Sequence, residues 1–537
     1  MTRLLAMLST ALCLGLLGLS GELRVGISGE PWNLDPALYT DIASVWLIQN
    51  IYDPLVELSV DGEPLPEYSL CEAWEFNEDA TTLTLHLRRG VKFHDGTDLT
   101  AEDVVYNFEW IINPDNASPV RKALGPVESV EGVDPYTVKV AFSSPFPEAI
   151  QYWSRALIGI VPADSRTGNE SPLMRNPIGT GPYRFVEWKR GSHILLEPFD
   201  DYWLEGIPPQ GIDRVKFLFF GDEASKVAAL LAGAVHILDW ISPRNYLALE
   251  GAPGLEVARI PGVQHQYIAL NLASHPFGIT ADEVGDEQAI ARALAARKFM
   301  MYAIDREEIR DEIFFGMATI MYGPWYPDSD WFSPNLRGRV LHDPELARQY
   351  LEEYYALGGE RPLRFRIMAT NAQWFVDVAT LIQEQLRGYG VQVEVVPLEK
   401  RTFFATLKTL DWEGAVEDFA HGIPAVLRWL HFGYYKVPNH NHWYHATPDL
   451  PPQYFPTHPG HDEFCALWDQ AAAEPDPERR RELVWQMDEM LVEDVIRIDL
   501  LMVDSLLAWR NEVRFAEGSV RLLGTLHLKA VTDLEVG

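Results

Sequence analysis

The most restrictive feature of this sequence is a strand-helix-strand pattern that runs from residue 363 to residue 395. Apolar and polar residues alternate over 363–367, as in a half-buried strand, and a helical pattern follows over 374–386. Alternating valines over 391–395 then predict a second strand. A strand, a helix and a strand in this order form a right-handed βαβ crossover with parallel strands. The segment therefore predicts an α/β fold.

Local signals elsewhere predict antiparallel strands and capped helices. Leucines at every second position over 83–87 predict a strand that is followed by turns. Thr100, followed by acidic residues, has the pattern of a helix N-cap, and this helix should end before the Asn-Pro pair at 113–114. Two Asp-Pro pairs predict helices over about 346–357 and 479–493, because Asp caps a helix and Pro fits its first position. The expected class is α/β with antiparallel additions.

Size and charge narrow the possible functions. The chain has 537 residues, of which 47% are hydrophobic, and this is enough apolar material for two or three cores. Its formal net charge of −34 would repel nucleic-acid phosphates and anionic lipid headgroups, so we expect no nucleic-acid partner. Cys71 and Cys465 lie far apart in the sequence and are expected to be small buried residues, with no disulfide or metal between them.

The first residues have the pattern of a secretory signal. A short charged start precedes an apolar run from Leu4 to Leu19, and small residues then predict cleavage near Ser20 or Gly21. Cys13 follows a bulky leucine, which disfavours lipidation at that cysteine. No later stretch is long and apolar enough to cross a bilayer. We expect a soluble protein that is exported to the periplasm.

The sequence contains no motif that makes an enzyme compelling. It lacks a nucleophile elbow, a zinc-protease helix, a Walker loop and a dinucleotide fingerprint. The Gly-Thr-Gly-Pro run at 179–182 resembles a phosphate loop only superficially, because Pro182 lacks a backbone donor. Glu417 and Asp418 are a possible pair of catalytic carboxylates, but adjacent residues point apart. An exported carboxylate-pair hydrolase is therefore kept only as an alternative.

The densest histidine cluster in the chain is also ambiguous. His440, His442 and His445 could bring two imidazoles to one metal ion if the segment is extended. A four-ligand site would need a further partner that the sequence does not identify, so a solvated loop is preferred. We expect no metal and no cofactor.

Aromatic residues are abundant, with 17 Trp, 21 Tyr and 24 Phe, and many lie in Gly- and Pro-rich contexts. Aromatic faces with a few charged groups are typical of a cleft that binds an organic ligand. More than half of these residues are expected to serve core packing instead. The candidates for the cleft are Trp32, Trp240, Tyr322, Trp325 and Trp412.

A series of motifs resembles the signature of the peptide/nickel family of ABC-transporter solute-binding proteins, solute-binding protein family 5. The motifs occur in the family's order, and the likeness spans essentially the whole mature chain. They are residues 34–36 (Leu-Asp-Pro), 51–55 (Ile-Tyr-Asp-Pro-Leu), 84–104, 176–183, 201–203 (Asp-Tyr-Trp) and 297–306.

The resemblance implies a two-lobed periplasmic-binding-protein clamshell, type II-like, with an extra third domain. By this analogy residues 1–21 are the signal peptide, domain I comprises 22–48, 178–269 and 500–537, domain II is 49–177, and domain III is 270–499. It further implies a monomer that captures peptides or peptide-like solutes in an inter-lobe cleft and is recognised by a membrane permease. Ligand would favour the closed form through its higher affinity for that form.

The resemblance also points to a ligand anchor in the C-terminal lobe. Peptide binders of this family commonly hold the ligand's ammonium with an Asp that lies shortly before an Asp-Pro pair. Here Ile423 replaces the Asp of that pair, and Asp418, or failing that Glu417, is the candidate anchor. His421 is a further candidate from composition. The departure leaves a non-peptide solute, such as an oligosaccharide, an opine or a metal complex, as the alternative cargo.

Overall fold

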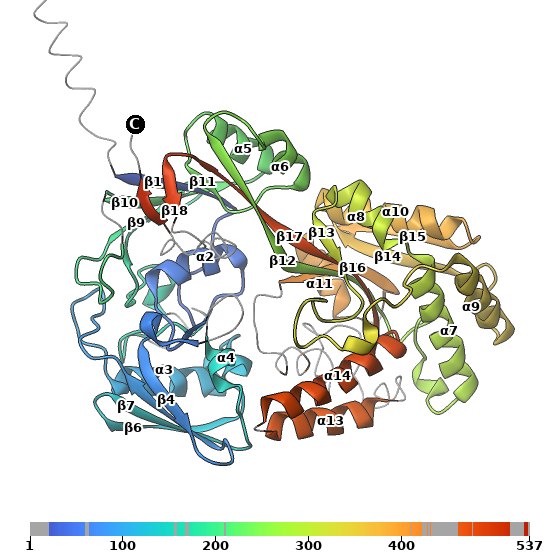
Figure 1. The fold of residues 1–537 in the computed structure, drawn as a ribbon, viewed down its shortest axis with the longest axis horizontal. Coiled ribbons are helices and arrows are strands. Elements are labelled where there is room, and N and C mark those ends of the chain that lie inside the picture. The colour runs from blue at the N-terminus through green and yellow to red at the C-terminus, as the bar shows by residue number, and fades with distance from the viewer. Residues whose placement is uncertain are drawn as a thin grey trace, which may run out of the picture. The chain divides into compact units, whose positions relative to one another are not determined.

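The computed structural model describes residues 21–534, except for short gaps and one long gap. The gaps are 59–63, 155–157, 167–170, 209–210, 410, 421–426, 428–429, 431–459, 475 and 516–530. The chain forms two compact units, unit 1 (Met1–Ile260 and Leu506–Gly537) and unit 2 (Pro261–Ser505). Strands β12 (Leu255–Leu270) and β17 (Arg497–Arg510) carry the chain from one unit to the other (Figure 1). The finer division into three domains stays a prediction.

Unit 1 contains a mixed sheet in the strand order β11-β1-β10-β9-β8. Its strands are β1 (Glu22–Ser28), β8 (Tyr183–Lys189), β9 (His193–Pro198), β10 (Arg214–Phe220) and β11 (Ile237–Leu238). Strand β1 is parallel to both of its neighbours, whereas β8 and β9 pair antiparallel. Leu23, Val25 and Ile27 alternate along β1 and are fully buried. This alternation places β1 in the core of unit 1.

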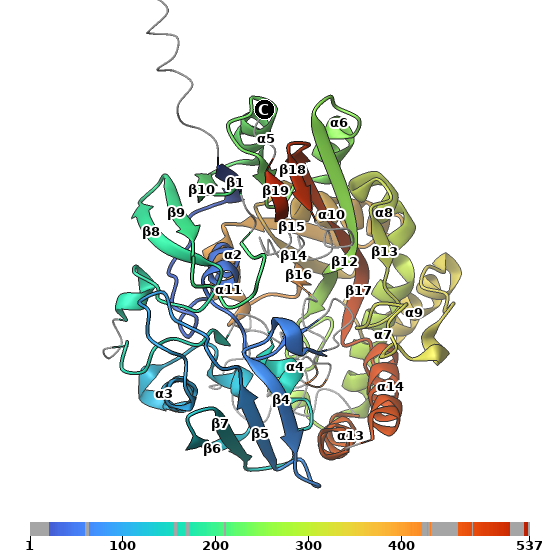
Figure 2. The same ribbon diagram turned by 60° about the vertical axis from the view of Figure 1, so that its left-hand side comes forward.

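A second sheet of unit 1 is antiparallel, in the order β4-β5-β7-β6 (Figure 2). Its strands are β4 (Cys71–Phe76), β5 (Thr82–Leu87), β6 (Val127–Asp134) and β7 (Thr137–Phe142), and helix α3 (Ala101–Ile112) packs against β6 and β7. The backbone N–H of Thr100 donates to Asp103 at 2.8 Å, as part of the capping box at the start of α3. The strand and the helix predicted here are confirmed.

Shorter elements complete unit 1. They are α2 (Ile42–Ile51), β2 (Glu57–Leu58), β3 (Pro64–Leu65), α4 (Ala149–Trp153), α5 (Glu223–Leu231), α6 (Pro243–Leu249), β18 (Val513–Phe515) and β19 (Val531–Leu534), with 3-10 turns at Pro66–Tyr68, Pro114–Asn116, Arg121–Leu124 and Pro172–Met174.

Unit 2 is built on strands in the order β15-β14-β16-β12-β17, with β13 (Ala318–Ile320) paired to β17. The strands β14 (Arg364–Thr370) and β15 (Gln392–Leu398) are parallel and joined by helix α10 (Gln373–Arg387). Strand β16 (Gly414–Ala420) is parallel to β14 and antiparallel to β12. The predicted βαβ unit is confirmed, and its apolar faces form part of the core of unit 2.

Helices surround this sheet. They are α7 (Glu287–Ala303), α8 (Arg306–Phe314), α9 (Pro344–Ala356), α11 (Lys400–Leu407), α13 (His461–Ala473) and α14 (Pro477–Glu493), with 3-10 turns at Ala281–Glu283 and Pro334–Leu336. Helices α7 and α9 pack along each other (Figure 1). Asp343 accepts from the backbone of Leu346 at 2.9 Å, and Asp476 accepts from that of Glu478 at 2.9 Å. Both Asp-Pro helix starts are therefore confirmed.

The Gly-Thr-Gly-Pro run packs against the end of α2. A Cβ atom at Gly179 would lie 2.1 Å from the carbonyl oxygen of Ile51, and one at Gly181 would lie 2.6 Å from the Ile51 carbonyl carbon. Only glycine permits this approach of two backbones. His94 also contacts this run, because its backbone N–H donates to the backbone oxygen of Gly179 at 2.9 Å. The run therefore has a packing role in unit 1.

Two further expectations concern the cysteines and the membrane. Cys71 and Cys465 are both buried, as predicted, and each is a free cysteine among the described residues. No helix among the described residues combines the length and apolar character that a bilayer crossing requires. The predicted signal segment lies outside the described residues.

Candidate functional site

Strand β16 directs its two candidate acids to opposite faces of the sheet in unit 2. Glu417 lies opposite Tyr267 of β12, and Asp418 lies opposite Gln266. Successive side chains of a strand point to opposite faces, so these two carboxyl groups do not form a catalytic pair. Each acid must therefore be assessed with its own neighbours.

Glu417 belongs to a buried polar network. Its carboxylate accepts from the Tyr267 hydroxyl at 2.8 Å, and the Arg497 guanidinium lies 4.5 Å from the centre of the Tyr267 ring. Arg497 also pairs with Asp499 at 2.7 Å, and His265 Nε2 lies 3.0 Å from the same carboxylate. Burial, aided by Arg497, lowers the pKa of His265 to about 4, although Asp499 acts against both. Glu417 is therefore committed to the structure of unit 2.

Asp418 has different surroundings. Its side chain is half-buried and forms no ion pair with any described residue. Burial raises the pKa of Asp418 to about 6, and the charge of Glu417 acts in the same direction, whereas Lys400 opposes it. A carboxyl group in this state gains free energy when a cation comes to it, because the cation offsets the cost of its desolvation.

Gln266 shares the face of Asp418. Its side chain is fully buried, and neither its amide nitrogen nor its amide oxygen has a hydrogen-bond partner in the described part of the chain. Buried amides without partners are rare in proteins because they cost about 1–3 kcal/mol. Gln266 and Asp418 together offer a hydrogen-bond donor, an acceptor and a carboxylate on one face of unit 2.

The aromatic candidates lie in three kinds of environment. Trp325 and Trp412 pack in the hydrophobic core of unit 2, and Tyr322 is half-buried against the same core. In unit 1, Trp240 is half-buried and Trp32 is 68% exposed. Trp325 and Trp412 are buried and contribute to the packing of this core, and their assignment to a ligand cleft stays a prediction. A Gly- and Pro-rich context does not distinguish a core indole from an accessible one.

Several predictions fall outside the described residues. They concern His421, Ile423, and the cluster of His440, His442 and His445.

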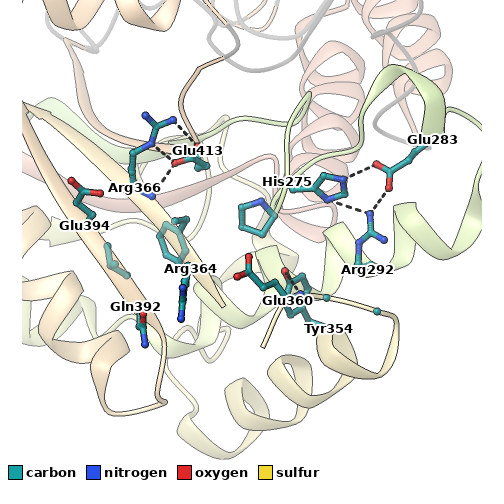
Figure 3. A pocket seen from close by; sticks show the side chains of 15 residues that line it. His275, Glu283, Arg292, Tyr354, Glu360, Arg364, Arg366, Gln392, Glu394 and Glu413 are labelled. Carbon is teal, nitrogen blue, oxygen red and sulfur yellow. Dashed lines mark hydrogen bonds and ion pairs between the residues drawn. The ribbon is translucent and has the colours of Figure 1, made fainter. Parts of the chain in front are cut away.

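A pocket of about 860 Å³ opens in unit 2 (Figure 3). Five of its charged side chains form ion pairs: His275 and Arg292 both contact Glu283, at 3.0 and 2.6 Å, and Arg366 pairs with Glu413 at 2.8 Å. Burial acts to raise the pKa of Glu283, but the backbone N–H of Thr280, together with Arg292 and His275, lowers it to about 2. None of the predicted ligand-binding residues that the structure describes lines this pocket. The candidate site is therefore assigned to β16 and not to this pocket.

Gln266 is not among the residues that the sequence predicts. A signal was present, because Gln264, His265 and Gln266 are three successive polar residues that precede the buried segment 267–270 of the same strand. In a strand with core on both sides, polar residues at successive positions indicate a polar site or network.

Comparisons with known proteins agree with this architecture. Residues 66–428 match the family described as bacterial extracellular solute-binding proteins, family 5. The glutathione-binding protein GsiB of Pectobacterium atrosepticum is 28% identical over 368 residues, which are 68% of this chain and 67% of that protein.

Solved structures share the fold. Helicobacter pylori DppA in complex with the peptide STSA has a TM-score of 0.78 and 22% identity, covering 96% of this chain and 98% of DppA. Campylobacter jejuni NikZ in complex with Ni(L-His) has a TM-score of 0.73 and 20% identity, covering 92% and 94%. The predicted α/β fold of two-lobed periplasmic binding proteins is confirmed, and so is the predicted solute-binding class. The chain belongs to family 5 of the bacterial extracellular solute-binding proteins.

Proposed function

We propose that this protein is the extracytoplasmic substrate-binding component of an ABC importer and that its cargo is a peptide or a peptide-like solute. Its family membership supports the importer role. Relatives named for glutathione and a solved neighbour in complex with a peptide support the cargo class. The protein captures cargo, adopts the form that the cargo favours, and delivers the cargo unaltered to a membrane permease.

Export through the predicted N-terminal signal is part of the proposal. A binding component of an importer works outside the cytoplasmic membrane, and residues 1–21 have the composition of a cleaved signal. N-terminal sequencing of the protein from a periplasmic extract should begin near Gly21. A start at Met1 in that fraction would contradict cleavage.

Asp418 is the residue that we assign to the ammonium group of the cargo. The observation that carries this assignment is a half-buried carboxyl group without an ion pair, beside the unpartnered amide of Gln266. Glu417 is the weaker candidate because one oxygen of its carboxylate already accepts from the Tyr267 hydroxyl. An ammonium paired with Asp418 would retain a partner after it leaves water, as a desolvated charge requires.

The structure also bears on the choice between peptide and sugar. Sugar rings stack on indole faces, so an oligosaccharide cargo would require accessible indoles. Trp325 and Trp412 are in the core of unit 2, so among the four candidate indoles the accessible ones are Trp32 and Trp240. The carboxyl group of Asp418, which a cation would stabilise, supports a peptide-like cargo over a neutral sugar.

Native mass spectrometry of protein purified without refolding would test this function directly. We expect a set of short peptides, or one peptide-like solute, to dissociate on denaturation. Calorimetry should then show that Asp418→Asn weakens binding of that cargo by about 2–5 kcal/mol, whereas Glu417→Gln leaves the affinity nearly unchanged. Recovery of a neutral sugar would overturn the cargo class. Catalytic alteration of added substrates would support the hydrolase alternative instead.

A further inference from the structure

A cluster of two arginines, one tryptophan and one glutamate lies at strand β8 in unit 1. The Arg175 guanidinium carbon lies 4.0 Å from the centre of the Trp188 ring, and that of Arg190 lies 5.1 Å from it. A guanidinium over an indole face is attracted by the ring and is held in one orientation. The cluster is thus a rigid cationic spot on a chain with a net charge of −34.

Glu30 is the acid of this cluster, and its carboxylate accepts three hydrogen bonds. It accepts from Trp188 Nε1 at 2.7 Å, from Arg190 at 3.3 Å and from the backbone N–H of Gly191 at 3.0 Å. These hydrogen bonds lower the pKa of Glu30 although burial opposes them. Glu30 therefore balances one arginine of the two, which leaves a positive charge in excess.

Arg175 carries the positive charge that Glu30 does not balance. Its side chain makes no hydrogen bond to any residue that the structure describes, and its Nη1 atom is buried without a partner. Burial and the charge of Arg190 lower its pKa, but a guanidinium stays charged at every physiological pH. A charged guanidinium fork that is held over the Trp188 ring, with no acceptor among the described residues, is complementary to a carboxylate.

The exposed Trp32 lies on a segment that is anchored next to this cluster at both ends. The segment that carries it is fixed at one end by Glu30 at Trp188, and at the other by Leu34, whose N–H donates to the Met174 oxygen at 3.1 Å. Met174 directly precedes Arg175. Trp32, at 68% exposure, is thus an accessible apolar side chain on the segment between these two anchored residues.

We infer that Arg175 binds a carboxylate group of the cargo, with Trp188 holding the guanidinium in place. The inference rests on the proposed function, because a peptide-like solute supplies the carboxylate at its free C-terminus. It goes beyond that function by naming a residue of unit 1 and the chemical group that this residue selects.

A pair of peptide mixtures would test the inference. The probes are di- to pentapeptides with free C-termini and the same peptides with C-terminal amides, which lack the negative charge. The two mixtures compete for the cargo-free protein, and native mass spectrometry measures what is bound. We expect the wild type to prefer free C-termini by at least about tenfold, and Arg175→Gln to lose this preference while still binding peptides.

Two further variants keep the test interpretable. Arg184→Gln removes a positive charge from an exposed ion pair with Glu197 on the same strand, and it should keep the preference. Arg175→Lys keeps the charge without the bidentate fork and should show an intermediate preference, even if Arg175→Gln folds poorly. The inference is wrong if Arg175→Gln retains the full preference, or if the wild type binds both mixtures equally, an outcome that leaves peptide binding itself intact. If neither mixture binds, the proposed function fails, and the inference with it.

Discussion

Tyr202 donates its hydroxyl hydrogen to the carboxylate of Asp53 at 2.9 Å, although 149 residues separate the two in the sequence. Trp203 donates to the other oxygen of the same carboxylate at 3.0 Å. Both partners come from motifs that resemble the family signature, Ile-Tyr-Asp-Pro-Leu and Asp-Tyr-Trp. The contact shows that these motifs serve to hold unit 1 together, since Asp53 is fully buried.

Removing this carboxylate should destabilise unit 1. In Asp53→Ala, the donors of Tyr202 and Trp203 lose their acceptor, and we expect the free energy of unfolding to fall by about 1–3 kcal/mol. Urea unfolding followed by circular dichroism measures the change. Asp98→Ala, which removes an exposed partner of Lys92, is the control and should change stability by less than about 0.5 kcal/mol. Equal losses of stability in the two variants would show that the buried hydrogen bonds of Asp53 contribute no more than an exposed ion pair.

The ion pair between Arg166 and Asp35 should behave as a coupled unit. Both side chains are fully buried, and two guanidinium nitrogens lie 3.0 Å from carboxylate oxygens. Arg166→Met leaves a buried charge without its partner and should cost about 3–5 kcal/mol. The double variant Arg166→Met with Asp35→Leu should recover much of that loss, because no buried charge remains. Additive losses in the two single variants and the double variant would contradict coupling.

Gln266 should lower the stability of the cargo-free protein and strengthen the binding of cargo. Gln266→Leu removes an amide that has no partner in the described structure, so the cargo-free protein should gain about 1–2 kcal/mol in its free energy of unfolding. The same substitution should weaken cargo binding, because the amide no longer meets the ligand. Thermal unfolding and calorimetry report the two effects. Gln264→Leu changes a half-buried glutamine of the same strand and should alter neither. A loss of stability in Gln266→Leu would show that its amide is satisfied.

Cargo affinity should depend on pH through Asp418. Its raised pKa of about 6 means that the cargo-free protein holds a proton there below pH 6, and this proton must leave before an ammonium can pair with the carboxylate. Affinity should therefore fall as the pH drops from 7 to 5, and the fall should disappear in Asp418→Asn. Calorimetry across this range, with one cationic cargo, measures it. A fall of equal size in Asp418→Asn would assign the dependence to another group.

The same pKa shift affects stability with a defined sign. The folded chain binds more protons at Asp418 than the unfolded chain does between about pH 4 and pH 6, because folding raises this pKa. Stability of the cargo-free protein should therefore decrease as the pH rises through this window. Asp418→Asn should lack this contribution when its denaturant midpoints are compared with those of the wild type. Parallel curves for the two proteins would contradict the shift.

Local patterns were sufficient to predict several elements of the fold. The helix caps at Thr100, Asp343 and Asp476 and the βαβ unit around α10 depend on residues a few positions apart, and their periodicity is a direct consequence of helix and strand geometry. The family motifs likewise indicated the solute-binding class before any contact was known.

The site depended on contacts that only folding creates. Alternation along β16 predicts that Glu417 and Asp418 face apart, but the register with β12 decided that Glu417 meets Tyr267 and that Asp418 meets Gln266. Trp325 and Trp412 could not be recognised as core residues, because their burial depends on segments distant in the sequence.

Arg175 illustrates the same limit. Its lack of an acceptor follows from where Trp188, Arg190 and Glu30 come to lie, and no spacing in the sequence encodes that arrangement. Short-range geometry thus determined the elements of this protein, and the series of motifs indicated its family. Tertiary packing decided which charged side chains have partners within the protein and which remain available to a ligand. The reason is that hydrogen bonds and desolvation depend on neighbours in space.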